Sequence, residues 1–273
     1  MNLITFSEEL TIVKEIIKKA GKEVMRIYEK NDFSVKEKDD YSPVSEADIS
    51  SNKIIIQELK KRFSYPIISE ESENKSFVSN SYWIIDPLDG TKNFVKRDGE
   101  FSIMIGLIKA GELFLGVVYV PAQDELYFAE KGKGSYMEKN NIKTKLQVTH
   151  KDDFSNQIYL VSKNHFSEID KKFLLFLESE IFIQKGSIGI KVAEICKGTA
   201  DIYFNFDGLN IWDLCAPQII LEEAGGEAFD LKGQPFLYSS KKSRFTEGIV
   251  LTNGQKKDFF VQKIKEFISK KDL

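Results

Sequence analysis

Two aspartates with only two residues between them follow directly on an apolar run in this chain. The run Trp83-Ile84-Ile85 leads into Asp86-Pro87-Leu88-Asp89, and Gly90-Thr91 comes next. Proline fixes φ at about −65° and suits the second position of a tight turn, so we expect a turn that brings Asp86 and Asp89 close together. Carboxylate and carbonyl oxygens are the ligands that Mg²⁺ prefers. The segment predicts a divalent-cation site, although Asp-Pro and Asp-Gly also occur in ordinary turns.

Gly90 and Thr91 add groups that can bind an anion. Glycine lets the backbone approach a ligand closely, and successive amides can form a phosphate cradle. The Thr91 hydroxyl could hold an attacking water, or it could be a simple helix cap or turn hydroxyl. Acids followed by such a loop indicate phosphate chemistry at a metal.

Further acids are candidates, and each has an ordinary structural alternative. Glu70-Glu71 follow the apolar run Ile67-Ile68 and either face a crevice beside the next strand or are simply solvated. Asp48 stands three residues after Ser45, which also makes it half of a helix capping box. Asp213 lies near the start of a predicted helix, where the helix dipole favours an acid without any metal. For each acid both interpretations stay open here.

Composition restricts the class of protein. The chain has 273 residues, 42% hydrophobic and 30% charged, which is typical of a globular protein with one large core or two lobes. A net charge of −3 gives no reason to expect a nucleic-acid partner. No apolar run approaches the ~18 residues of a membrane helix, and the N-terminus lacks the features of a signal peptide. We expect a cytoplasmic protein without an integral membrane segment, and weak peripheral membrane association stays open.

Cysteine and histidine are scarce. Cys196 and Cys215 are far apart and form no Cys-x-x-Cys motif, so we expect reduced thiols rather than a zinc site or a thiol nucleophile. His150 and His165 are the only histidines, and neither is near the acidic motifs in sequence. The chemistry is therefore expected to use carboxylates and metal.

Hydrophobic periodicity predicts the elements that position these residues. A helical stripe runs over 6–28, and a second helix is expected over 45–63 with a buried face of Ile49, Ile55, Ile56, Leu59 and Phe63. Short strands follow at 66–69 and 82–85, and a hairpin joins 101–109 to 113–120. Further strands are expected at 126–128 and 134–136.

From about residue 156 the pattern alternates between strand and helix. Strands are expected at 158–161, 181–183, 201–206 and 248–251, and helices at 168–177, 188–196 and 211–224, before a basic terminal helix. The chain therefore divides into an α+β lobe over 1–150 and an α/β lobe over 151–273. No flexible linker separates them, so we expect one continuous folding unit with its ligand cleft at the junction.

Taken in order, the motifs resemble the signature of the inositol monophosphatase-like superfamily. The resemblance lies in Glu70-Glu71-Ser72, the segment 86–91, and Trp212-Asp213 with Gly225-Gly226; the segment 42–48 is similar to an earlier element of the same signature. It implies a layered α-β-α-β-α sugar-phosphatase-like fold with mixed sheets and an active site at the junction of the two lobes. That superfamily contains lithium-sensitive, magnesium-dependent phosphatases, so the resemblance also implies a magnesium-dependent phosphatase, and lithium sensitivity stays open.

Within this superfamily the chain is most similar to the CysQ-type 3'(2'),5'-bisphosphate nucleotidases. Ser162-Lys163-Asn164-His165 and the segment 212–217 resemble nucleotidase elements, and Ser69 stands where inositol phosphatases often have glycine. Two departures leave the substrate open. Lys163-Asn164 replaces the usual middle pair of its element, and the segment 203–208, with Asp207, replaces a Pro-Arg-Phe-Gly stretch, so an arginine for the nucleotide's second phosphate is missing there.

The resemblance also implies roles for individual residues. The metal ligands would be Glu70, Asp86, the Leu88 carbonyl, Asp89 and Asp213, holding two or three Mg²⁺ ions, with Mn²⁺ as an alternative. The catalytic group would be Asp48, Glu70 and Thr91, in which Asp48 and Thr91 orient or deprotonate the water. The substrate would contact Leu88, Asp89, Gly90, Thr91, Ser162, His165, Ser187, Lys191 and Asp213.

The predicted reaction is magnesium-dependent hydrolysis of adenosine 3',5'-bisphosphate to AMP and phosphate, which removes a by-product of sulfur assimilation. The alternatives are an inositol monophosphatase or a fructose 1,6-bisphosphatase, which share every metal residue. An alternative of another class is a non-catalytic regulator that binds a phosphorylated metabolite. The partner in each case is a small phosphorylated molecule, and the protein is expected to be a monomer or a homodimer.

Overall fold

The computed structural model describes residues 4–30, 34–37, 43–72, 79–179 and 181–271. Within these ranges the helices are α1 (Glu8–Tyr28), α2 (Glu46–Arg62), α3 (Thr91–Lys96), α4 (Glu168–Phe176), α5 (Ile188–Cys196), α6 (Ile211–Glu223) and α7 (Lys257–Lys271), with short 3₁₀ turns at Pro121–Gln123 and Phe154–Asn156.

The strands form two main sheets. A seven-stranded sheet has the order β3 (Ile67–Ser69), β4 (Tyr82–Asp89), β5 (Ser102–Lys109), β6 (Glu112–Val120), β7 (Glu125–Glu130), β8 (Ser135–Lys139), β9 (Ile142–Lys145). A five-stranded sheet has the order β11 (Phe182–Lys185), β10 (Tyr159–Ser162), β12 (Ile202–Asn205), β16 (Ile249–Thr252), β14 (Glu227–Phe229). Two small ribbons pair β1 (Val35–Glu37) with β2 (Pro43–Ser45), and β13 (Leu209–Asn210) with β15 (Arg244–Phe245). Both main sheets are mixed, with parallel and antiparallel pairs.

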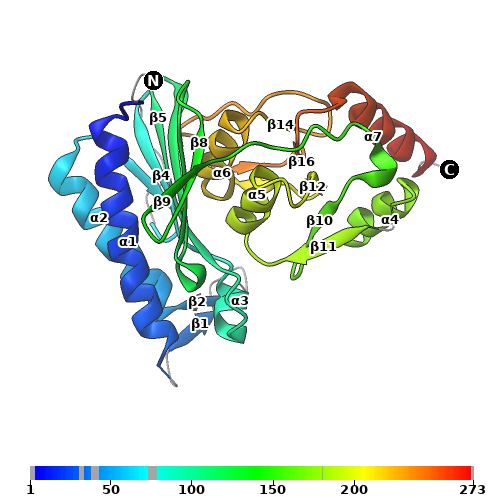
Figure 1. Ribbon diagram of the computed structural model, residues 1–273. Coiled ribbons are helices and arrows are strands. Elements are labelled where there is room, and N and C mark those ends of the chain that lie inside the picture. Colours follow the sequence, from blue (N-terminus) through cyan, green and yellow to red (C-terminus); the bar gives the residue numbers. More distant parts are fainter. Residues whose placement is uncertain (1–3, 31–33, 38–42, 73–78, 180, 272–273) are drawn as a thin grey trace.

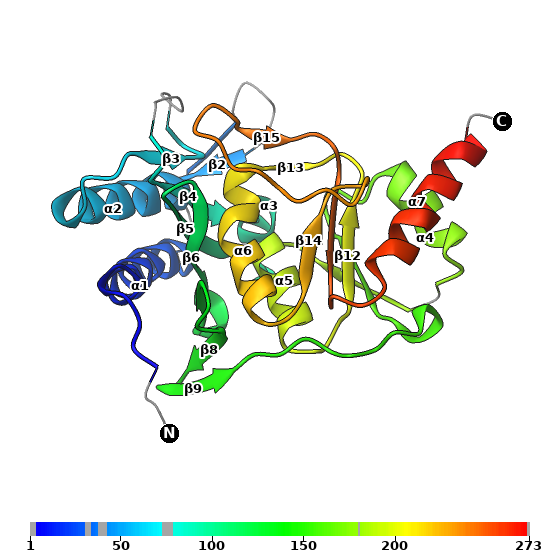
Figure 2. The same cartoon turned by 90° about the horizontal axis from the view of Figure 1, so that it is seen from above.

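Helices and sheets alternate in five layers (Figure 1). Helices α1 and α2 cover the outer face of the seven-stranded sheet, α5 and α6 lie between the two sheets, and α4 with α7 covers the far face of the five-stranded sheet. Viewed from above, α6 runs between the seven-stranded sheet and strand β14 (Figure 2). The predicted layered fold with mixed sheets is confirmed.

The first four residues of β4 are hydrophobic because both faces of the strand are covered. Trp83 and Ile85 belong to the core under α1 and α2, whereas Tyr82 and Ile84 belong to the core shared with α6. Successive side chains of a strand point to opposite faces, so a strand between two helical layers must be apolar at nearly every position. This burial holds the end of β4, which carries the acidic motif, in a fixed place.

Close packing also fixes α6, the helix that carries Asp213. A Cβ at Gly116 of β6 would lie 2.5 Å from the Ala216 carbonyl oxygen of that helix. Only glycine allows the helix backbone to approach the strand this closely. The position of Asp213 relative to β4 therefore depends on a glycine in a third element.

Most predicted elements are present, with ends that differ by a few residues. Helix α1 begins after Ser7, whose side chain accepts a hydrogen bond from the Leu10 amide, and the helix buries the predicted stripe. The expected burial of Ile49 is wrong, because its side chain is 53% exposed while Ile55 and Leu59 fill the core. Sequence periodicity did not predict α3, β9, β14 or the two small ribbons. Within the described ranges, no helix combines the length and the apolar composition that crossing a bilayer requires.

Candidate active site

The acidic motif lies in a β-bulge at the end of β4. Asp86 pairs with Met104 of β5, and Asp89 pairs with Ser102, so β4 contains one extra residue between the two pairs. The expected tight turn at Asp86-Pro87-Leu88-Asp89 is therefore wrong. A proline is tolerated at a bulge because no ladder hydrogen bond is required of it there. The bulge directs both aspartates toward the same cavity, of about 160 Å³.

Gly90 ends the strand and precedes α3. Its φ of +90° is a left-handed conformation, and a Cβ there would lie 2.8 Å from the carbonyl oxygen of Glu100. Both features require glycine. Gly90 and Thr91 line the same cavity as the two aspartates.

Asp48 is both a helix cap and a neighbour of Thr91, so the two alternatives given for it do not exclude each other. Its Oδ2 caps α2, accepting hydrogen bonds from the Ser45 amide at 2.8 Å and the Ser45 hydroxyl at 2.5 Å. Its Oδ1 accepts a hydrogen bond from the Thr91 hydroxyl at 2.9 Å. Burial raises the pKa of Asp48 to about 6, against the lowering effect of these hydrogen bonds. The helix cap therefore also positions a carboxylate behind Thr91.

Four carboxylates line the cavity beside this pair: Glu70, Asp86, Asp89 and Asp213. Burial and then the neighbouring acids raise the pKa of Asp86 well above its usual value. Burial, Asp89 and Glu70 raise the pKa of Asp213 to about 8. Like charges that share a low-dielectric site disfavour one another's ionised forms.

Two elements bring Glu70 and Asp213 to the end of β4. Strand β3 pairs in parallel with β4, and the Glu70 amide donates to the Ile85 carbonyl at 3.2 Å, so Glu70 leaves the sheet beside Asp86. Asp213 lies in the first turn of α6, where it accepts a hydrogen bond from the Asn210 amide at 2.9 Å. Like Asp48, Asp213 therefore caps its helix and is part of the site at the same time.

The donor set fits a divalent cation. The Asp86 side chain is 1% exposed and accepts a hydrogen bond from the Leu88 amide at 3.0 Å. The negative charges of Glu70, Asp89 and Asp213 are close enough to raise its pKa. Buried carboxylates at this density are unfavourable unless cations neutralise them, and their hard oxygens suit Mg²⁺. Among the described residues, no three acid, imidazole or thiol groups are already close enough together to coordinate one ion, so the carboxylates must move closer together when a cation binds.

Asp89 is held by residues from the second half of the chain. Its Oδ2 accepts hydrogen bonds from the Ser187 hydroxyl, and from the Gly189 amide at 3.1 Å. The Ser187 hydroxyl also caps α5, accepting a hydrogen bond from the Ile190 amide at 3.2 Å. Ser187 is fully buried, so its contact is with the acid rather than with the cavity. The predicted substrate residue instead positions a predicted metal ligand.

A second cavity, of about 320 Å³, adjoins the first, and Asp89, His165, Gly186 and Asp213 line both. Ser162, His165 and Lys191, all predicted as substrate residues, line the second cavity. The His165 amide donates to the Ser162 hydroxyl at 3.1 Å, which fixes the turn after β10. Burial lowers the pKa of the His165 imidazole, and nearby Lys92 and Lys191 lower it further.

Lys191 is a buried cation in the wall of the second cavity. Its side chain lies over the Tyr203 ring with Nζ 5.0 Å from the centroid, and Nζ donates to the Gly186 carbonyl at 3.2 Å. Burial lowers its pKa to about 8. An ammonium group held this way is ready to receive an anionic ligand.

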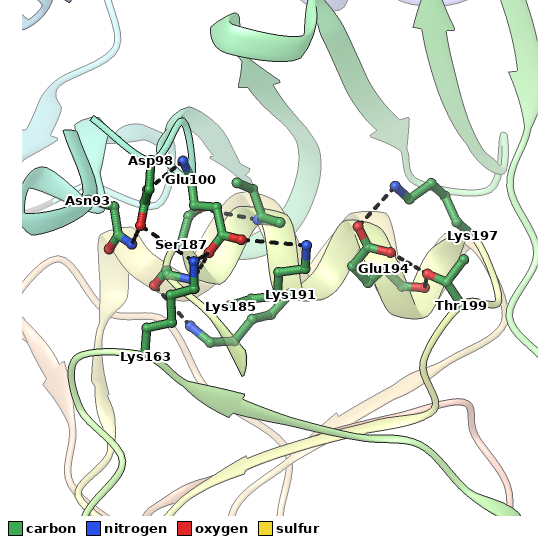
Figure 3. A network of polar contacts seen from close by, with 12 residues as sticks. Asn93, Asp98, Glu100, Lys163, Lys185, Ser187, Lys191, Glu194, Lys197 and Thr199 are labelled. Atoms are coloured by element: carbon green, nitrogen blue, oxygen red, sulfur yellow. Dashed lines mark hydrogen bonds and ion pairs between the residues drawn. The ribbon is translucent and has the colours of Figure 1, made fainter. Parts of the chain in front are cut away.

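Ion pairs join the two halves of the chain beside the cavities (Figure 3). Glu100 accepts hydrogen bonds from the Gly186 amide at 2.8 Å and pairs with Lys163 at 2.9 Å and Lys185 at 3.5 Å. Asp98 pairs with Lys163 at 3.4 Å. Lys163, which departs from the nucleotidase element, thus connects β10 to the segment after α3.

All twelve predicted site residues therefore lie in or directly behind the two adjoining cavities. The sequence reasoning missed other lining residues: Lys92, Asn93, Asn164 and Gly186 in the first cavity, and Ile188, Tyr203, Asn205, Leu209, Asn210 and Arg244 in the second. Lys92 and Asn93 directly follow the acidic motif, so their position in the sequence could have predicted their place in the first cavity. Arg244 gave none, because it reaches the cavity through the two-residue ribbon of β13 and β15.

Comparisons with known proteins identify relatives of this chain. Residues 7–268 match the model of the Inositol monophosphatase family. The chain is 33% identical over 243 residues to 3'(2'),5'-bisphosphate nucleotidase CysQ of Escherichia coli K12, which covers 86% of this chain and 96% of that protein. It is 35% identical over 234 residues to the protein of the same name from Buchnera aphidicola, covering 82% of this chain and 85% of that protein.

Solved structures share the fold over nearly the whole chain. An IMPase of Thermotoga maritima superposes with a TM-score of 0.83 at 26% identity, covering 97% of this chain and 99% of that chain. The CysQ structure from Bacteroides thetaiotaomicron, described as a bacterial member of the inositol monophosphatase family, gives a TM-score of 0.78 at 27% identity, covering 92% of this chain and 99% of that chain.

Proposed function

This chain belongs to the inositol monophosphatase family, and we propose that it is a magnesium-dependent nucleotidase that hydrolyses adenosine 3',5'-bisphosphate to AMP and phosphate. The observation that carries the proposal is the juxtaposition of two cavities. One gathers four buried or partly buried carboxylates beside the Thr91–Asp48 pair, and the other opens directly from it. In this proposal the first cavity binds the metal and the transferred phosphate, and the second cavity binds the rest of the substrate.

The choice of substrate rests on the second cavity and on the relatives. At about 320 Å³, this cavity is in the size range of small-molecule sites. Ile188, Tyr203 and Leu209 add apolar surface to its largely polar lining, and a nucleoside can pack against that surface better than a bare polyol can. The curated relatives named above are called 3'(2'),5'-bisphosphate nucleotidases, which favours the same substrate.

Glu70, Asp86, the Leu88 carbonyl, Asp89 and Asp213 would hold the metal. When bound, Mg²⁺ supplies positive charge that stabilises the transferring phosphoryl group and makes water a better nucleophile. Ser187 and the Gly189 amide keep Asp89 in place for this role. The amides of Thr91 and Lys92, at the start of α3, would hold a phosphate oxygen beside Gly90.

The Thr91–Asp48 pair would orient the attacking water and take its proton. The Thr91 hydroxyl donates its hydrogen to Asp48, so its oxygen lone pairs remain to accept a hydrogen bond from water. With a pKa of about 6, Asp48 is mostly ionised at neutral pH and can accept a proton through Thr91. The water oxygen forms a bond to phosphorus in line with the breaking bond to the 3'-oxygen. The 3'-oxygen keeps the electron pair of that bond, takes a proton from solvent and departs with AMP into the second cavity. No phosphoenzyme is required.

A substrate panel tests the proposal. Phosphate release is measured with adenosine 3',5'-bisphosphate, inositol 1-phosphate and fructose 1,6-bisphosphate, each with Mg²⁺ and each with EDTA. We expect kcat/KM for the nucleotide to exceed the other two by at least about 10-fold, a difference of ~1.4 kcal/mol, and EDTA to abolish turnover. A preference for either sugar phosphate would overturn the nucleotidase assignment. Tight binding of the nucleotide without metal-dependent turnover would indicate a non-catalytic regulator instead.

A further inference from the structure

Arg244 brings a second cation to the lining of the second cavity. It lies on β15, opposite Asn210 of β13, and therefore beside the first turn of α6. Its guanidinium donates to the Asp207 carbonyl at 2.9 Å, to the Gly208 carbonyl at 3.4 Å and to the Asn210 side-chain oxygen at 3.4 Å. These three acceptors are neutral. Over the described part of the chain, Arg244 forms no ion pair with a carboxylate, and its charge acts on Asp213 only at longer range.

The guanidinium keeps donors for a ligand. Arginine has five N–H groups in a planar fork, and the three contacts above occupy three of them at most. The fork geometry matches phosphate and carboxylate oxygens, which can accept two parallel hydrogen bonds. Because neutral backbone oxygens fix the side chain, little of its conformational freedom remains to be lost when an anion binds.

Both acidic and basic side chains line the second cavity. Asp89 and Asp213 face it where it joins the first cavity, in the part that we assign to metal and the transferred phosphate. Lys191 and Arg244 supply positive charge on the same lining, and exposed Asp207 is the remaining acid there. An anion in this cavity would therefore meet two cations, of which Arg244 is the one with an exposed side chain.

We propose that Arg244 binds a second anionic group on the leaving part of the substrate and so selects bisphosphates over monophosphates. The proposal rests on the proposed function and adds a specificity-determining residue to it. The transferred phosphate lies beside Asp86 and Asp213, the nucleoside lies along Tyr203 and Leu209, and the 5'-phosphate reaches the Arg244 fork. A substrate that lacks the second phosphate gains nothing from this residue.

The test compares substrates with and without the second phosphate. The kcat/KM values for adenosine 3',5'-bisphosphate and adenosine 3'-monophosphate are measured for the wild type, Arg244→Ala and Arg244→Lys, with Lys241→Ala as the control. Lys241 is an exposed cation in the turn before β15 and lines neither cavity. We expect Arg244→Ala to lower kcat/KM for the bisphosphate by about 10- to 100-fold, mainly through KM, and to change the value for the monophosphate less than about twofold. Arg244→Lys should lose less, and Lys241→Ala should match the wild type.

An equal loss with both substrates would overturn the proposal, because it would mean that Arg244 only supports the backbone of 207–210. No loss with either substrate would overturn it as well. A separate binding measurement keeps this outcome distinct from a failure of the proposed function. Calorimetric titration in EDTA with adenosine 5'-monophosphate and with adenosine requires no turnover, and the wild type should bind the phosphorylated ligand more tightly. If Arg244→Ala keeps that difference, or if the wild type lacks it, Arg244 is not the anion site, whatever substrate the enzyme hydrolyses.

Discussion

The hydroxyl of Thr91 donates a hydrogen bond to Asp48 at 2.9 Å, joining the first turns of two helices 43 residues apart in the chain. The same aspartate caps α2 through its other oxygen. Two hydrogen bonds therefore fix the Asp48 side chain, one to the start of α2 and one from the Thr91 hydroxyl. A base that must keep one orientation beside a reacting water benefits from such a double constraint.

Asp48→Asn should lower kcat by about 100- to 1,000-fold, because an amide cannot accept a proton from water through Thr91. The matched control is Asp170→Asn. Asp170 forms the same capping box with Ser167 at the start of α4 and lines neither cavity. Both substitutions should cost about 0.5–2 kcal/mol of unfolding free energy. Steady-state kinetics together with urea unfolding separate the two effects, and equal kcat values for the two variants would rule out a catalytic role for Asp48.

Asp89→Asn should retain the fold and lose turnover. Loss of an outer partner of a metal ligand typically costs 10- to 100-fold in affinity or activity, so loss of a ligand should cost at least about 100-fold. Ser187→Ala, which removes the hydroxyl that holds Asp89, should give the smaller effect and retain partial activity. Circular dichroism checks the fold and Mg²⁺ titration of activity checks the affinity. Activity near that of the wild type in Asp89→Asn would remove this residue from the site.

The metal-free protein should lose stability as pH rises. The folded-state pKa of Asp213 is raised to about 8 from 3.8, so the folded state binds the extra proton between these values. Its contribution to stability is present at low pH and is lost as pH increases toward 8. We expect the melting temperature in EDTA to fall between pH 5.5 and pH 8.5, and Mg²⁺ to raise it more at the higher pH.

Asp213→Asn is the control for this dependence, because it should flatten the fall in melting temperature while leaving the contributions of other groups in place. Thermal scans of both proteins at matched ionic strength provide the comparison. A melting temperature for the metal-free wild type that stays level or increases over this range would contradict the charge distribution described here.

Glu100→Gln should weaken the contact between the two halves of the chain (Figure 3). Glu100 binds the Gly186 amide and two lysines with a side chain that is 14% exposed, so we expect a loss of ~1–3 kcal/mol in unfolding free energy and a higher KM. Glu112→Gln is the control. Its pair with Lys131, at 2.6 Å, joins side chains that are 70% and 53% exposed, and such pairs contribute ~0–1 kcal/mol. Equal losses for the two variants would show that Glu100 is an ordinary surface acid.

The sequence was sufficient where a property depends on neighbouring residues or on a regular period. The stripe of α1 and the limits of α5 follow from helical periodicity, and the acids of the segment 86–91 are contiguous. The sequence was insufficient where the local conformation depends on pairing between distant segments. Pro87 suits a turn as well as a bulge, and only the alignment of β4 with β5 selects the bulge.

Tertiary pairing also explains the remaining differences. Ser187 contacts Asp89 rather than the cavity because α5 packs against β5, which periodicity within α5 cannot predict. Arg244 reaches the second cavity only because a two-residue ribbon pairs it with Asn210. Ile49 belongs to the helical pattern but lies on the outer side of α2, where it is 53% exposed.

Anomalous diffraction from crystals soaked in Mn²⁺ is the most direct test of the central claim, that Glu70, Asp86, Asp89 and Asp213 form one divalent-cation site. Manganese gives an element-specific signal and shares the oxygen ligands of magnesium. We predict at least one strong anomalous peak within coordination distance of Asp86 and at least one other of these carboxylates, absent from crystals of Asp89→Asn or weaker in them. Well-diffracting Mn²⁺-soaked crystals with no anomalous peak among these residues would contradict the account.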